Sequence, residues 1–230
     1  MKRFLWILLA AALLLCGCDK AGYTQTEQTE AALERYLSAV EQSTAQTTGV
    51  FRISVECEDN VVQKKTTHES YIYQFSVDEG GNEQFTYTAL DEAGKTIHTY
   101  KTTADGVVDE TGAPSQDYQK FLKHATNPIS NMTLFRMDAD GKFRRSIIAD
   151  VALTQSGDDQ VLSVSFHPDK LTDLAVKSAG GLRRTVTWHE RKYTMRDGKI
   201  AAIDILDLEE GTYNKEKGTI RTTTHVEVEY

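Results

Sequence analysis

The feature that most restricts the fold of this chain is a period-two alternation of apolar and polar residues, which returns in ten separate segments. From Phe51 to Cys57, apolar side chains occupy every second position and polar ones fill the positions between. Successive side chains of a strand point to opposite faces, so this pattern predicts strands with one buried face. The ten predicted strands cover residues 50–58, 70–78, 83–89, 95–103, 107–110, 146–155, 160–167, 183–195, 199–210 and 218–230.

Short turn sequences connect many of these runs. Gly80-Gly81 follows the second run, and Asp197-Gly198 separates the eighth from the ninth. Gly-Gly and Asp-Gly between alternating runs are strong hairpin signals, so neighbouring strands are expected to pair antiparallel. Together with the helices below, this predicts an α+β domain with a large curved antiparallel sheet of about ten strands.

A helix is predicted before the first strand. Leu33, Tyr36, Leu37 and Val40 recur at helical spacing and form one apolar stripe. A capping box is expected to start this helix at Thr24.

Two further regions have helical spacing. One lies within residues 114–137, with Pro114 as its first helical residue, and the other within residues 167–179. We expect these inserted helices and the first helix to pack on the sheet.

The N-terminus predicts export. A short basic start is followed by an uncharged apolar run that ends at Leu15, as in secretory signals. The sequence Leu15-Cys16-Gly17-Cys18 resembles the bacterial lipobox. This resemblance implies cleavage after Gly17 and diacylglycerol on the Cys18 thiol, with acyl chains such as palmitate. The alternative is an uncleaved or ordinarily cleaved signal.

The lipobox divides the chain into three parts. Residues 1–17 are the predicted signal peptide, residues 18–28 the lipidated cysteine with a polar, extended tether, and residues 29–230 a single domain. Two or more acyl chains hold a protein stably on a membrane. We therefore expect a domain anchored to the extracytoplasmic face of a bacterial membrane.

Charge and cysteine content exclude some functions. The chain has 34 acidic and 26 basic side chains, for a formal net charge of −8. An acidic protein is a poor match for nucleic acid and for anionic lipid surfaces. With Cys16 removed and Cys18 lipidated, only Cys57 remains, so no internal disulfide is expected. Cys57 is interpreted as a buried free thiol, with a redox or intermolecular role as the alternative.

Three patterns in the sequence resemble catalytic or metal sites. Residues 89–96, ALDEAGKT, lack the first glycine of a phosphate-binding loop, and a strand follows instead of a helix. Residues 138–143, DADGKF, lack two main ligands of a calcium loop and are interpreted as a hairpin turn. The six histidines are far apart in sequence and show no zinc spacing. We therefore expect no metal, no cofactor and no enzyme activity.

One constellation remains as a candidate site. Five aromatic residues fall on the same side of two adjacent predicted strands: Tyr71, Tyr73, Phe75, Phe85 and Tyr87. They either form the ordinary core of the sheet or line an apolar cavity with tyrosine hydroxyls near its rim.

The element order resembles that of the LolA/LppX group of lipoproteins. A lipidated cysteine, an N-terminal amphipathic helix, a long antiparallel sheet and helices inserted midway carry this resemblance. It implies a half-barrel of strands around helices, with a hydrophobic cavity that the five aromatic residues would line. The favoured hypothesis is therefore a carrier of a lipid or other hydrophobic ligand. The alternatives are a structural or protein-interaction lipoprotein of the cell envelope and, third, an enzyme.

Overall fold

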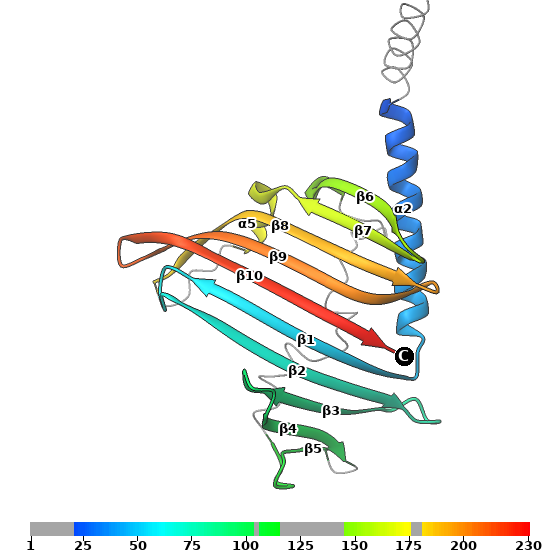
Figure 1. Cartoon of the computed structure of the whole chain (residues 1–230), viewed down its shortest axis with the longest axis vertical. Coiled ribbons are helices and arrows are strands. Elements are labelled where there is room, and N and C mark those ends of the chain that lie inside the picture. Colours follow the sequence, from blue (N-terminus) through cyan, green and yellow to red (C-terminus); the bar gives the residue numbers. More distant parts are fainter. Residues whose placement is uncertain (1–20, 104–105, 116–144, 176–180) are drawn as a thin grey trace, which may run out of the picture.

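The ten predicted strands form one antiparallel sheet in the computed structural model (Figure 1). The structure describes residues 21–103, 106–115, 145–175 and 181–230. The strands are β1 (Thr48–Asp59), β2 (Lys65–Val77), β3 (Glu83–Leu90), β4 (Thr96–Thr103), β5 (Gly106–Val108), β6 (Ile148–Ser156), β7 (Asp159–Phe166), β8 (Arg183–Arg196), β9 (Lys199–Tyr213) and β10 (Glu216–Glu229).

The strand order is β5-β4-β3-β2-β1-β10-β9-β8-β7-β6. Two meanders, β1 to β5 and β6 to β10, are therefore joined by the pairing of the first strand with the last. Ile53 of β1 lies opposite Val226 of β10 in this central register. The described sheet is open, with β5 and β6 as its edge strands.

The two faces of the sheet differ as the alternation predicts. The inner face carries the buried side chains, such as Phe51 and Ile53 on β1 and Ile203 on β9. The outer face carries exposed polar side chains such as Arg52 and His225. One apolar cluster extends over the inner face of most strands and includes residues of the first helix.

The first helix, α2 (Ala21–Thr44), packs on the inner face against β9 and β6. Its buried side is formed by Ala32, Leu33, Tyr36, Ala39 and Ser43. In Figure 1 its first turns extend past the edge strand β6. Among the described residues, no helix is long and apolar enough to cross a membrane.

Two expectations for this helix were wrong. Residues 21–28 were expected to form an extended tether, but the helix begins at Ala21 rather than at Thr24. The Gln and Glu residues of this segment favour helix without an apolar stripe, so periodicity does not detect it. Leu37 was assigned to the buried stripe but is 36% exposed, and Ala39 and Ser43 are buried instead.

The predicted helix after β7 is confirmed as α5 (Pro168–Ala175), which packs on β8 and places Leu171 against the core. A short 3-10 helix, η1 (Arg145–Ile147), precedes β6. Pro114 does not start a helix. It forms a bridge with Val108, and the N–H of Ser115 donates to the Val107 carbonyl.

Several predictions lie outside the described residues. They are the signal peptide 1–17, the cysteines Cys16 and Cys18, the first tether residues, the helices expected within 116–137, the turn at 138–143, His124, and residues 176–179 of the last helix.

The β8–β9 turn at Asp197-Gly198 is confirmed. Both residues have positive φ, of 50° and 75°, as a two-residue hairpin turn requires. The turn lies against α2, since a Cβ added at Gly198 would meet Gln42 Oε1 at 2.7 Å. A larger residue at this position would displace the Gln42 side chain and strain the positive φ of the turn.

Candidate functional site

The five aromatic residues singled out from the sequence come together on the inner face of β2 and β3. Tyr73 lies directly opposite Tyr87, and Phe75 directly opposite Phe85, while Tyr71 lies opposite an alanine. We call this set of five side chains the aromatic strip. The expectation that they share one face of two adjacent strands is confirmed.

The rings of the strip stack on one another across and along the strands. Tyr73 stacks on Phe85 with ring centroids 5.7 Å apart and on Phe75 at 6.3 Å. Tyr71 stacks on Tyr87 at 5.5 Å. Offset stacking of this kind stabilises aromatic pairs beyond the area they bury, so the strip is a continuous apolar surface.

Neighbouring rings extend the strip on both sides. Phe51 on β1 stacks on Phe75 at 5.8 Å, and Tyr100 on β4 lies 6.4 Å from Tyr87. Sequence reasoning left both residues out. The pattern around Tyr100 is ambiguous, because Ile97 is three positions away and therefore lies on the opposite face, where it is 51% exposed.

Burial divides the strip into two groups. Tyr73 and Tyr87 are 1% and 3% exposed and belong to the packed core. Tyr71, Phe75 and Phe85 are half-buried and pack against that core from its border. The strip thus has buried central rings and accessible peripheral rings, and lining of a cavity by these residues stays a prediction.

The tyrosines of the strip keep their protons at physiological pH. The hydroxyls of Tyr71 and Tyr73 donate to the carboxylates of Glu69 and Glu83. Burial raises the pKa of both phenols well above the ordinary value, and these carboxylates raise the pKa further. The pKa of Tyr87 is raised mainly by burial. The rings therefore present an uncharged surface to any ligand.

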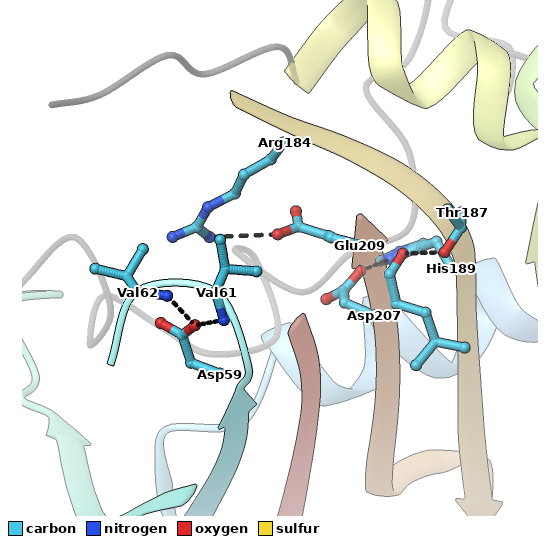
Figure 2. Close-up of polar contacts among 9 residues, drawn as sticks. Asp59, Val61, Val62, Arg184, Thr187, His189, Asp207 and Glu209 are labelled. Atoms are coloured by element: carbon cyan, nitrogen blue, oxygen red, sulfur yellow. Dashed lines mark hydrogen bonds and ion pairs between the residues drawn. The ribbon is translucent and has the colours of Figure 1, made fainter. Parts of the chain in front are cut away.

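A chain of polar contacts crosses the opposite half of the inner face. His189 Nδ1 contacts the Asp207 carboxylate, as Figure 2 shows, and Arg191 Nε donates to His189 Nε2 at 3.0 Å. Tyr193 is hydrogen-bonded to both Arg191 and Tyr36 of α2. We call these five residues the polar chain.

The contacts of His189 define the direction of its two hydrogen bonds. Since Nε2 accepts a hydrogen bond from Arg191, it carries no proton, and Nδ1–H must donate to Asp207. The ring thus lies between the Asp207 carboxylate and the Arg191 guanidinium. His189 is 9% exposed and packs edge-on against Phe166, with centroids 4.8 Å apart.

Sequence reasoning missed the polar chain because it looked for histidines at metal spacing. The available signal was the alternation itself. His189, Arg191 and Tyr193 are two residues apart on one strand, so they share the face that is otherwise apolar.

A second, smaller core closes one end of the inner face. The loop after β1 places Val61, 2% exposed, between Leu182 and Ile220. Asp59 Oδ1 accepts the backbone N–H groups of Val61 and Val62, both at 2.8 Å (Figure 2). Burial opposes ionisation of Asp59, but these backbone donors lower its pKa below the ordinary value overall. This cap fixes the loop on the sheet.

Cys57 packs beside this second core. It is half-buried and is a free thiol among the described residues. A redox or intermolecular role for Cys57 stays a prediction.

Two grooves run beside α2. The larger, about 580 Å³, lies between α2 and β6 and is lined by residues such as Ala31, Val151 and Leu153. The smaller, about 420 Å³, lies between α2 and the β8–β9 turn. Both have the size of small-molecule sites. The contact between helix and sheet therefore leaves space open to a ligand.

The outer face carries paired charges around a shallow basin of about 370 Å³. His225 Nδ1 lies 2.6 Å from Asp204 Oδ1, and His68 Nδ1 lies 3.3 Å from Glu56 Oε2. The hydrogen bond with Asp204 raises the pKa of His225. Within the described ranges, no three metal-ligating side chains come together.

The segment ALDEAGKT forms the end of β3 and the β3–β4 turn. The N–H of Asp91 donates to the Lys95 carbonyl at 2.9 Å, and Gly94 has φ +77°. No helix follows, so the geometry of a phosphate-binding loop is absent from this part of the chain.

Comparisons with known proteins identify no family for this chain. No protein-family model and no curated protein matches the sequence. Two similar solved structures are a domain described as an outer membrane lipoprotein-sorting protein from Vibrio parahaemolyticus and a LolA superfamily protein from Nitrosomonas europaea. They are 6% and 7% identical to this chain, cover 88% of it, and are themselves covered over 92% and 91% of their length. Both names agree with the resemblance seen in the element order, but a TM-score of 0.29 carries no argument about fold or function.

Proposed function

We propose that this protein is a lipid-anchored protein of the bacterial envelope that binds a hydrophobic ligand on the inner face of its sheet. The observation that carries the proposal is the aromatic strip. Its half-buried rings, Tyr71, Phe75 and Phe85, border a packed core of the same chemistry. Aromatic rings give large apolar contact area, which is what a lipid chain requires.

The electrostatics of the strip support this proposal. Its phenols are uncharged, and two of them are engaged with carboxylates of the same sheet. An acyl chain could thus lie on the rings without desolvating a free charge, which is the main cost of apolar binding at a polar surface. The grooves beside α2 are open space on the same face, but they lie toward the β6 edge and not at the aromatic strip.

The ligand hypothesis is tested by displacement of a fluorescent lipid analogue from the purified protein. We expect Phe75→Ala and Phe85→Ala each to weaken binding several-fold, because each removes a ring at the accessible border of the strip. Trp188→Ala is the matched control, since Trp188 is 42% exposed and points to the outer face. Thermal melting of each variant checks that the fold is kept. Equal binding by all variants would contradict the proposal.

The anchor is tested with the two neighbouring cysteines. We expect Cys18→Ser to abolish incorporation of labelled palmitate and to prevent cleavage after Gly17, because the thiol that takes the lipid is gone. Cys16→Ser keeps the proposed lipidation site and is the matched control. Loss of the label in Cys16→Ser, or its retention in Cys18→Ser, would contradict the anchor assignment. A protein that is anchored but binds no lipid would favour the protein-interaction alternative.

A further inference from the structure

Arg191 is a charged side chain in the middle of an apolar face. It lies on β8 between Val164 of β7, which is fully buried, and Ile205 of β9. Arg191 itself is half-buried. Holding a guanidinium among apolar side chains is costly unless it is hydrogen-bonded, and the polar chain supplies these bonds. These bonds keep a cation on the same face of the sheet as the aromatic strip.

The polar chain fixes the orientation of Arg191. Its Nε is turned toward His189, whose far nitrogen is held by Asp207. Tyr193, 1% exposed, is also hydrogen-bonded to Arg191. A guanidinium is a planar fork of N–H donors that matches a carboxylate, and its orientation here is set before any ligand arrives.

An accessible band leads from Arg191 to the aromatic strip. Ile205, Thr224 and Val55 follow Arg191 across β9, β10 and β1 in direct register, and all are half-buried. On β2 the row ends at Glu69, which is exposed and lies opposite Val55. The hydroxyl of Tyr71 donates to the Glu69 carboxylate, so the end of the row meets the edge of the aromatic strip. We call this row the inner band.

The neighbouring row of side chains on the same face is buried. Tyr193, Ile203 and Val226 are each at most 1% exposed. The inner band is thus an accessible row beside a buried one. Four strand spacings of about 4.8 Å separate β8 from β2, or roughly 19 Å, a span comparable to an extended long acyl chain.

We propose that the ligand is a long-chain fatty acid whose carboxylate binds Arg191 and whose acyl chain lies along the inner band toward the aromatic strip. This inference rests on the proposed function and names the ligand class. Charge complementarity supports it, since Arg191 is the cation of the band. The carboxylate of Asp207 is separated from the ligand's head group by the ring of His189, and Glu69 lies at the far end of the row.

The experiment compares three ligands with the same chain, namely oleate, oleyl alcohol and oleylamine. Each ligand, kept below its critical micelle concentration, competes with a fluorescent fatty-acid analogue for binding to the full-length purified protein. We expect oleate to bind about tenfold or more tightly than oleyl alcohol, since hydrogen bonds to charged groups exceed neutral ones. Oleylamine should bind least, because its ammonium group faces a guanidinium.

Two variants and a control locate the effect. Arg191→Gln should remove the preference for oleate over the alcohol, while Arg191→Lys keeps the charge and should retain part of it. Arg184→Gln is the control, since Arg184 is exposed and its ion pair with Glu209 lies at the end of β8. Equal affinity for oleate and oleyl alcohol, or an unchanged preference in Arg191→Gln, would overturn the head-group assignment alone. Failure of all three ligands to bind would overturn the proposed function as well.

Discussion

Ser43→Ala is the sharpest test of how α2 is joined to the sheet. Ser43 is 2% exposed, and its Oγ accepts the backbone N–H of Ile200 at 2.8 Å. Ile200 is the second residue of β9 and is fully buried, so no water replaces a lost acceptor. Alanine is nearly the size of serine, so the variant removes the hydrogen bond and leaves little cavity.

The magnitude follows from the cost of a buried donor without a partner. That cost is about 1–3 kcal/mol. A domain of this size loses about 2–4 °C in melting temperature for each kcal/mol. We therefore expect Ser43→Ala to lower the melting temperature by about 4–8 °C for a loss of about 2 kcal/mol.

The assay combines thermal unfolding with amide hydrogen exchange. Ser38→Ala is the matched control because Ser38 is exposed on the same helix, where substitutions stay within about 0.5 kcal/mol. The amide of Ile200 should exchange faster in Ser43→Ala and unchanged in Ser38→Ala. Equal melting temperatures and equal exchange at Ile200 in the two variants would refute the reasoning.

Three further predictions concern the second core, the loop after β1 and the outer face. Gly211→Ala places a Cβ 2.8 Å from Val61 Cγ2 and should cost about 1–3 kcal/mol in urea unfolding, with Val61→Ala partly restoring stability. Asp59→Ala should cost about 1 kcal/mol at neutral pH. The pKa of Asp59 in the folded protein is lowered from 3.8, so its contribution to stability is lost as pH falls through this lowered pKa. The unfolding curves of the wild type and of Asp59→Ala should therefore converge in acid. The pKa of His225, measured by NMR, should lie above 6.5. Its ion pair with Asp204 should stabilise the fold fully below pH 6.5 and lose this effect as pH rises through the raised pKa. Asp204→Asn should lower the pKa of His225.

The strands and the composition of each face were predictable because both follow from local alternation. Tyr73 and Phe85 alternate with polar neighbours within a few residues, and hairpin turns fix the pairing of β2 with β3. The pairing of β1 with β10 was not predictable in this way. Val50 and Glu229 are partners from the first and the last strand, far apart in the sequence, and no local pattern encodes such a contact.

The candidate site was predictable in its apolar half only. The aromatic strip is a property of two neighbouring strands, so alternation places it correctly. The polar chain depends on contacts between β8, β9 and α2, with Tyr36 and Tyr193 brought together at a centroid distance of 4.7 Å. The role of a histidine or an arginine on an apolar face can be predicted only when its partners on other elements are known.

Native mass spectrometry of the full-length protein, purified as the cell makes it, tests the central claim most directly. We expect a discrete non-covalent mass that organic solvent removes and that is identified as a lipid with a long acyl chain. The same preparation of Phe85→Ala should carry less of it. A protein that shows only its own covalent mass, and that takes up no lipid when mixed with a membrane extract, would contradict ligand binding on the inner face.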